Sequence, residues 1–575
     1  MKSKGSSRFY TFFIAVVAIC CGVVWIGLRD SEAQVAWAIR LADIVNSFDE
    51  ATIYNTRSNK HLLGSYAPVI EEHKKERMKI ISGEIPGDAS GLFMRIGPNQ
   101  IHGHYSRRYH LFDGHGMIHA VRLQKANDSE GAAESVAFYS NQYLNTPRYE
   151  LEKKLDRPVF LLIGELKGMV GLVKALLVTP LILFVLKKTQ LNTGQANTAI
   201  YSYQSRLFAG HEGSLPFEIY WDDEEKAMKS IGYETFGDRL NYPVTAHAKV
   251  DPVEGELFFL SYSPNDKQHP MKYGYMNASA DMTAYYGIPI PVIPFAHDFA
   301  MTEHYILVIE SSVHFTPEKL LQGEFFSFTS SHKFRIGVVL KASHSASEIQ
   351  WFETDSPLCV VHTMHAWEQH TEDGLEIVLW TPIAPSFDGG LQERADFTMR
   401  EVRLKMRSGE MSITTIDTRY QIEFPRVHPD YLGRPARYGF AHSFTGELSD
   451  VMYFNGIVKY DMQHKRVAGA LFLADNYVFS GECIPIPKDR SGAVEEQGVG
   501  DYSDTVYLGA FVLNLITDSA EWHLYDGESM SSTPLVRLDV PARVPMGFHS
   551  DWMSEAKLQQ HIAATKLSND NMARY

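Results

Sequence analysis

The chain has 575 residues, enough for one large domain or several of average size. Its formal net charge of -15 argues against non-specific binding to nucleic acid, and no nucleic-acid partner is expected. The four cysteines, two of them adjacent at Cys20 and Cys21, provide neither a disulfide framework nor the spacing of a cysteine-based zinc site. Histidine is abundant, with 24 residues, so sites built from histidine alone deserve attention.

The N-terminal region contains an uncharged apolar segment from Phe9 to Leu28, preceded by three basic residues. A segment of this length can span a bilayer as a helix, and the leading positive charges favour a cytoplasmic N-terminus. The alternative is a cleaved signal peptide, for which Ser31–Ala33 offers a weak cleavage-like stretch. We expect a retained single-pass membrane anchor over residues 1–30, with the side of the membrane that the body faces left open.

The remaining body, residues 31–575, has many short runs rich in Val, Ile, Tyr and Phe, separated by Asp, Gly and Pro. This pattern is typical of antiparallel hairpins. Four examples cover residues 247–262, 372–382, 402–416 and 446–462. A chain of this length built from such hairpins predicts an all-β fold that is closed or radially repeated, such as a β-propeller, although no clean sequence repeat is visible.

One apolar segment, residues 161–188, interrupts this pattern and looks helical. Pro180 breaks it, and Glu165, Lys167 and Lys174 add polar positions. We expect an apolar helical patch that lies in the interface of a membrane, and the alternative is a buried core helix.

Several histidines occur in similar apolar contexts. They are His247 in TAHAKVDP, His297 in FAHDFAMTE, His362 and His365 in VVHTMHAWE, and His549 in VPMGFHSDW. From His247 through His297 and His362 to His549, the separations are far too long for one helix, unlike the histidines of an HExxH motif. Such residues meet only through tertiary structure. Inner strands of a propeller bring histidines to one axial metal, but with 24 histidines the spacing alone is weak support.

The motifs together resemble the carotenoid cleavage oxygenase family, which includes the retinoid isomerohydrolase of the eye and bacterial lignostilbene dioxygenases. The matching stretches run in order over nearly the whole body, among them GLFMRIGPNQ, HLFDGHGMIHAVRL, TAHAKVDPVEGELFFLSY, HTMHAWE, SGECIPIP and VPMGFHSDW. The resemblance implies a seven-bladed β-propeller with a helical cap, here preceded by the N-terminal transmembrane helix. It also implies Fe(2+) held by His247, His297, His362 and His549, with His362 preferred to its neighbour His365.

The resemblance also assigns three glutamates that accept hydrogen bonds from ligand imidazoles: Glu212, Glu423 and Glu482. A metal-bound histidine donates its other N–H, and a carboxylate there fixes the tautomer and ring orientation. The sequence departs from the family pattern at two points. His115 stands where the family has Asp, and Ser550 follows the last histidine where Gly is common. A structural substitution is preferred for His115 over a role beside the metal.

The resemblance implies a dioxygenase in which Fe(2+) activates O2 and both oxygen atoms add across a conjugated C=C bond of a carotenoid or apocarotenoid, giving two carbonyl products. The apolar polyene is expected to be drawn from a lipid bilayer. A stilbene-cleaving dioxygenase is the alternative and needs a polar contact for a phenol, for which Tyr109 and Arg148 are candidates. A retinoid isomerohydrolase and a non-catalytic propeller that binds an apolar ligand are further alternatives. The sequence sets no expectation for the oligomeric state.

Overall fold

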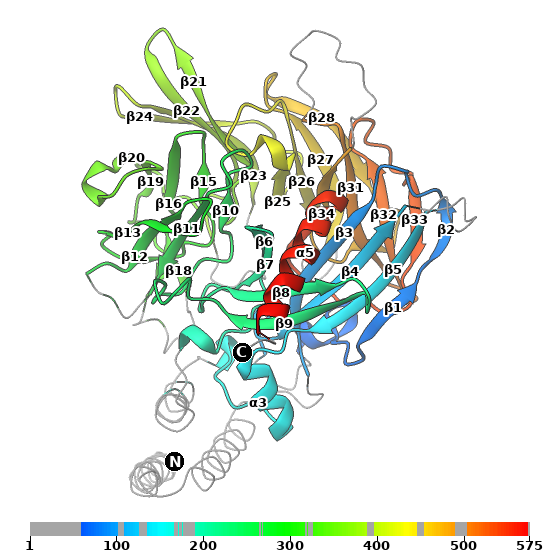
Figure 1. Ribbon diagram of the computed structural model, residues 1–575. Coiled ribbons are helices and arrows are strands. Elements are labelled where there is room, and N and C mark those ends of the chain that lie inside the picture. Colours follow the sequence, from blue (N-terminus) through cyan, green and yellow to red (C-terminus); the bar gives the residue numbers. More distant parts are fainter. Residues whose placement is uncertain are drawn as a thin grey trace, which may run out of the picture.

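The computed structural model describes residues 59–101, 109–125, 135–165, 190–263, 268–316, 326–387, 396–444, 453–488 and 503–572, and the single residues 171, 175, 266 and 319. Strands β1 to β34 dominate this part of the chain (Figure 1). The two α-helices that it contains in full are α3 (Pro147–Leu155) and α5 (Glu555–Met572). The fold is therefore all-β.

Strand pairing is antiparallel and gives seven sheets among the described residues. The first contains β1 (His73–Arg77), β5 (Val136–Tyr143), β4 (His115–Gln124), β3 (Gly91–Asn99) and β34 (Ser550–Ser554). The second contains β6 (Ala199–Tyr203), β7 (Arg206–Gly210), β8 (Phe217–Asp222) and β9 (Ala227–Tyr233). The third contains β10 (Lys249–Val250), β11 (Leu257–Tyr262), β12 (Met271–Met276) and β13 (Met282–Ile288).

Three further sheets follow in the middle of the chain. A three-stranded sheet contains β14 (Ile293–Pro294), β17 (Val313–Phe315) and β18 (Phe326–Phe328). A four-stranded sheet contains β15 (Ala300–Met301), β16 (Tyr305–Glu310), β19 (Phe334–Leu340) and β20 (Gln350–Thr354). Another contains β21 (His365–Thr371), β22 (Gly374–Ile383), β23 (Thr398–Lys405) and β24 (Glu410–Thr415).

The seventh sheet has ten strands. Its path runs through β2 (Lys79–Gly83), β33 (Val536–Asp539), β32 (Ala520–Asp526), β31 (Val506–Asn514), β29 (Tyr477–Phe479), β27 (Phe454–Asp461), β26 (Tyr438–Phe444) and β25 (Ile422–Val427). Off this path, β28 (Arg466–Phe472) pairs with β27, and β30 (Ile484–Pro487) pairs with β31. The short strand β29 pairs with both β27 and β31 and so joins two groups of strands.

This pairing corrects the expectation of a seven-bladed propeller with a helical cap. Seven separate blades require seven independent sheets of similar size, whereas the sheets here have from three to ten strands. Helices are also few in the described chain, and most of the apolar segment 161–188 lies outside it. The observed architecture is an all-β assembly of unequal sheets.

The expected transmembrane helix is likewise corrected. The predicted anchor, residues 1–30, lies outside the described residues, and within them no helix is long and apolar enough to cross a bilayer. The longest, α5, has the sequence EAKLQQHIAATKLSNDNM, in which charged and amide side chains recur along its length, whereas a spanning helix needs about 20 mainly apolar residues. The membrane localisation that depended on a spanning helix is withdrawn with it.

The hairpins show how the local sequence produces the sheets. Strand β8 alternates buried and half-buried residues, as expected where one sheet face packs on a core. Between β10 and β11, Asp251 accepts the backbone N–H groups of Val253 and Glu254. Gly255 completes this turn at φ 68°, a conformation that glycine adopts without strain. Turn chemistry therefore fixes where β10, the strand that follows His247, ends and where β11 begins.

Distant parts of the chain meet in the first sheet. Strand β34 pairs with β3, with Arg95 opposite Ser550. The buried Arg122 on β4 donates through Nη1 and Nη2 to the two carboxylate oxygens of Glu555 at the start of α5, at 2.7 and 2.9 Å. In Figure 1, α5 lies across the strands of the first two sheets. These contacts hold the segment that carries His549 against the N-terminal strands.

Candidate metal centre

Four histidines converge in the interior, each lying at most three residues before the start of a strand. The strands are β10, β15, β21 and β34, and the residues are His247, His297, His362 and His549. Their ligand atoms all lie within 4.8 Å of one another. Four of the sheets thus each direct the start of one strand to the same point.

The distances between the histidine Nε2 atoms fit a metal site. They are 3.1 Å between His247 and His297, 3.0 Å between His297 and His362, and 3.2 Å between His362 and His549. Two nitrogens that bind one ion at about 2.1 Å lie about 3.0 Å apart at a right angle and about 3.4 Å apart at a tetrahedral angle. The observed spacing is nearer the right angle, which corresponds to a site with room for more than four ligands.

Carboxylates hold the opposite nitrogens of three rings. Glu212 Oε1 lies 2.7 Å from Nδ1 of His297, Glu423 Oε2 lies 2.5 Å from Nδ1 of His362, and Glu482 Oε2 lies 3.3 Å from Nδ1 of His549.

A neutral imidazole that donates from Nδ1 carries a bare lone pair on Nε2. The three lone pairs therefore face one another with no proton between them, and a cation at their centre relieves the repulsion. The donor set fits a divalent transition metal.

Burial favours the neutral form of two of the four histidines, His247 and His549. Burial, reinforced by the neighbouring rings, holds the pKa of His247 well below its ordinary value, and burial lowers the pKa of His549 to about 4. Burial acts in the same direction on His362, but the Glu423 carboxylate outweighs it and raises the pKa of that ring. Burial acts to raise the pKa of Glu212, but the adjacent His297 lowers it to about 2.

A distorted strand directs Glu423 toward its histidine. The register of β25 and β26 shifts between Glu423 and Arg426, as at a β-bulge. Phe424 has φ 49°, which is costly for a bulky residue, and its N–H donates to Glu423 Oε2 at 2.8 Å. The Phe424 ring then lies 5.5 Å from the ring of His362 and 5.0 Å from that of His549. Backbone strain here orients a carboxylate and an aromatic ring at the same centre.

Glu482 is fixed from several directions. Arg426 donates to both of its oxygens at 2.7 Å, and Ser550 donates its N–H to Oε2 at 2.9 Å. Burial opposes ionisation, but Arg426 and His549 hold the pKa of Glu482 far below its usual value. The Ser550 hydroxyl also donates to the Glu482 carbonyl at 2.7 Å, a contact that glycine cannot make. The departure at position 550 therefore strengthens the support of the last histidine.

Two neighbours of the histidines were missed by the sequence reasoning. The Phe295 ring stacks on His297 at 5.6 Å, with an interplanar angle of 5°, and with Phe424 it gives the centre apolar, π-rich walls. Asp298 bonds to residues beside two other histidines, as described below. Both Phe295 and Asp298 lie within two residues of His297 in the sequence, and this proximity was the available signal.

Other residues singled out from the sequence lie elsewhere. His365 donates from Nε2 to the carbonyl of Arg434, 2.7 Å away, and is not among the four clustered histidines. His115 is buried with its Nε2 2.9 Å from a carboxylate oxygen of Glu152 on α3, so its partner is this carboxylate and it is not among the four clustered histidines. Arg148 is 3.4 Å from the same carboxylate.

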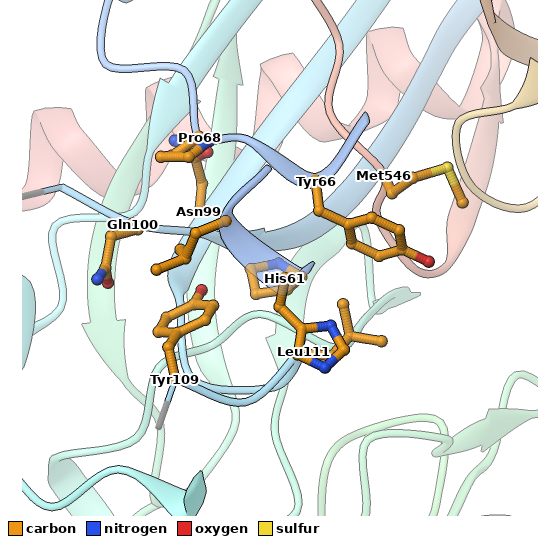
Figure 2. Close-up of a pocket in the computed structure, with 10 residues that line it drawn as sticks. His61, Tyr66, Pro68, Asn99, Gln100, Tyr109, Leu111 and Met546 are labelled. Atoms are coloured by element: carbon orange, nitrogen blue, oxygen red, sulfur yellow. The ribbon is translucent and has the colours of Figure 1, made fainter. Parts of the chain in front are cut away.

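Tyr109, the other candidate for a phenol contact, lines a separate pocket (Figure 2). This pocket contains about 250 Å³ of space, part of it open to solvent. In Figure 2 its rim is formed by side chains that include His61, Tyr66, Asn99 and Met546. None of the four clustered histidines lines it, so Tyr109 is not placed at the metal centre by this pocket.

Comparison with known proteins identifies the class. Residues 66–554 match the family model described as retinal pigment epithelial membrane protein. The chain therefore belongs to this family, the carotenoid cleavage oxygenases, as the motifs suggested.

Individual relatives and solved structures are similar to most of this chain. A carotenoid 9,10(9',10')-cleavage dioxygenase of Pisum sativum is 29% identical over 91% of this chain and 95% of its own length. A chloroplastic 9-cis-epoxycarotenoid dioxygenase of Arabidopsis thaliana is 30% identical, covering 87% of this chain and 82% of its own length. Among solved structures, a lignostilbene dioxygenase of Pseudomonas brassicacearum superposes with a TM-score of 0.71 at 21% identity, covering 87% of this chain and all of that one. The apocarotenoid oxygenase of Synechocystis gives a TM-score of 0.68 at 20% identity, covering 87% of this chain and all of that one. The curated relatives are thus carotenoid-cleaving dioxygenases, and the structural neighbours share the fold.

Proposed function

We propose that this protein is a non-haem Fe(II) dioxygenase that cleaves a conjugated C=C bond of a carotenoid or apocarotenoid with O2, giving two carbonyl products. The observation that carries the proposal is the convergence of four imidazole nitrogens on one point, with a carboxylate behind three of the four rings. Imidazole is a suitable donor for iron. The near-right-angle spacing of the nitrogens leaves positions open beside them, and the relatives' reactions favour iron over zinc.

Each group of residues has a distinct part in this proposal. His247, His297, His362 and His549 would hold Fe(II), and the bound iron would supply the activation of O2. The three glutamates accept from Nδ1 and so fix the tautomer and the aim of their rings, so that little reorganisation is needed when the metal or the substrate arrives. The rings of Phe295 and Phe424 offer apolar faces beside the centre, which suit a flat polyene and exclude water.

The substrate class follows from the relatives' names and from the walls of the centre. The curated relatives cleave carotenoids and epoxycarotenoids according to their names. A stilbene substrate is not favoured by a specific contact, because Arg148 is committed to Glu152 and Tyr109 lines the separate pocket.

The proposal is tested with purified protein loaded anaerobically with Fe(II) and then mixed with O2 and a panel of carotenoids, apocarotenoids, stilbenes and retinyl esters. Under ¹⁸O2, mass spectrometry of the products should reveal paired aldehydes or ketones from a polyene, each carrying one labelled oxygen. Phenolic aldehydes from stilbenes would assign the alternative dioxygenase, and a retinol isomer formed without O2 would assign an isomerohydrolase. Iron-loaded protein that converts none of these compounds would overturn the proposed reaction.

A further inference from the structure

The residues that follow three of the four histidines meet at one carboxylate, that of Asp298. Lys249 Nζ lies 2.8 Å from Asp298 Oδ1. Thr363 donates both its backbone N–H and its hydroxyl to Asp298 Oδ2, each at 2.8 Å. Asp298 directly follows His297, Thr363 directly follows His362, and Lys249 lies two residues after His247. One side chain therefore links three ligand-bearing segments from three different sheets.

This network is buried and its charges are paired. Asp298 is 6% exposed and Thr363 is 7% exposed, and the Lys249 side chain is largely covered. The Lys249 ammonium also lies 5.3 Å from the centre of the Phe299 ring. Charge-assisted hydrogen bonds in such an environment are short and directional, so they fix the relative positions of the backbones that carry them.

The fourth histidine is held by a separate set of contacts. His549 depends on Glu482, which Arg426 and Ser550 fix from the other side. Contacts to Asp298 therefore link the segments that carry three of the histidines, and contacts to Glu482 hold the fourth.

We propose that Asp298 is a positioning residue that sets the mutual geometry of His247, His297 and His362. It does not touch the metal, and it acts through the peptide units shared with the histidine-bearing segments. The inference depends on the proposed function, because it assumes that these histidines bind a metal. The spacing of the three histidines then depends on the buried Asp298 carboxylate, which is neither a ligand nor one of the three glutamates that contact the ligand rings.

The first test is the substitution Asp298→Asn. Whichever way the amide turns, its NH2 group faces either the Lys249 ammonium or the two Thr363 donors, so one side of the network opens. We expect Fe(II) affinity, measured by chelator competition, to fall about tenfold, the lower end of the range for residues that support metal ligands. We also expect the visible d–d spectrum of the Co(II)-substituted protein to change, because ligand positions shift.

The matched control is Asp504→Asn, which breaks another Lys–Asp pair, one in which the lysine is buried and the aspartate is partly exposed. Asp504 Oδ2 lies 2.7 Å from Nζ of Lys459, which is 4% exposed and belongs to the ten-stranded sheet. This variant should lose thermal stability but keep the Fe(II) affinity and the Co(II) spectrum of the wild type. If Asp504→Asn changes the metal readouts as much as Asp298→Asn does, the effect is general destabilisation and the proposal is wrong.

A milder variant covers the case in which Asp298→Asn does not fold. Thr363→Val removes the hydroxyl bond and keeps the backbone bond to Asp298. We expect about threefold weaker Fe(II) binding, corresponding to one lost hydrogen bond, and a smaller change in the Co(II) spectrum. Wild-type affinity and spectrum in a folded variant of Asp298 or Thr363 would overturn the positioning role. Wild-type protein that binds no Fe(II) would instead overturn the proposed function, so the two failures are distinguishable.

Discussion

The contact between Glu423 and His362 gives a prediction whose size follows from the structure. Glu423 is 7% exposed, and its Oε2 accepts from His362 Nδ1 at 2.5 Å and from the N–H of Phe424 at 2.8 Å. In the substitution Glu423→Gln, the amide oxygen can take the place of Oε2 and accept the same two hydrogen bonds. The NH2 group then takes the place of Oε1, which has no hydrogen-bond partner in the described structure. What changes is the charge. A charge-assisted bond contributes about 1.5–3 kcal/mol and a neutral one about 0.5–1.5 kcal/mol, so the difference is about 1–1.5 kcal/mol. We therefore expect Fe(II) affinity to fall about tenfold, with a small effect on folding.

The assay is chelator competition for Fe(II), run beside thermal unfolding of the metal-free protein. The control is Glu521→Gln, because Glu521 Oε2 lies 2.7 Å from Nε2 of His523, a glutamate–histidine contact outside the centre. Glu521→Gln should leave Fe(II) affinity unchanged. The reasoning is refuted if Glu423→Gln binds Fe(II) as tightly as the wild type, or if both variants lose affinity equally.

Three further predictions concern the other histidines and one buried carboxylate. His297→Ala should abolish stoichiometric Fe(II) binding while the circular dichroism spectrum stays native, and iron retained at wild-type stoichiometry would remove His297 from the ligand set. His365→Leu should keep full iron content, because the His365 ring contacts a backbone carbonyl and not the cluster, and loss of iron would mean that the third ligand has been misassigned. Burial acts to raise the pKa of Glu152, but Arg148 and His115 lower it from 4.5 to about 2. Because the carboxyl pKa is lower in the folded than in the unfolded protein, the ionised Glu152 contributes about 3 kcal/mol to stability above pH 4.5. This contribution is lost as the pH falls from 4.5 toward about 2. Urea unfolding between about pH 5 and pH 3 should show this loss in the wild type and much less of it in Glu152→Gln, and equal slopes would contradict the assignment.

The sequence was most informative where function depends on residue type. The resemblance to the family nominated His247 and Glu423 through the motifs in which they stand, and the structure places both at the histidine cluster. The role of Asp298 was not visible, although it is adjacent to His297. Its function requires that Lys249 and Thr363 approach from other sheets, and that approach is a property of tertiary packing.

The arrangement of sheets was less predictable. Alternation and turn residues indicate hairpins, but they do not say which hairpins join edge to edge. The strand Tyr477–Phe479 is only three residues long, yet it connects two groups of strands into the ten-stranded sheet. For the departure at His115, a structural substitution was preferred over a role beside the metal, but the sequence did not indicate its partner. Its partner, Glu152, lies on a helix that the local sequence of His115 does not reveal.

The pairing of β3 with β34 also determines when the protein can mature during its synthesis. Arg122 and Glu555, which meet beside this pairing, are 433 residues apart, and 187 residues separate His362 from His549. While the ribosome is still adding the intervening chain, the edge of β3 that β34 later covers has no partner, and open strand edges promote misassembly. During this time the first three histidines, which have already been synthesised, lack His549. If the four histidines hold iron as proposed, full loading is a late event, and a nascent chain stalled before residue 549 is expected to need a chaperone and to retain iron poorly.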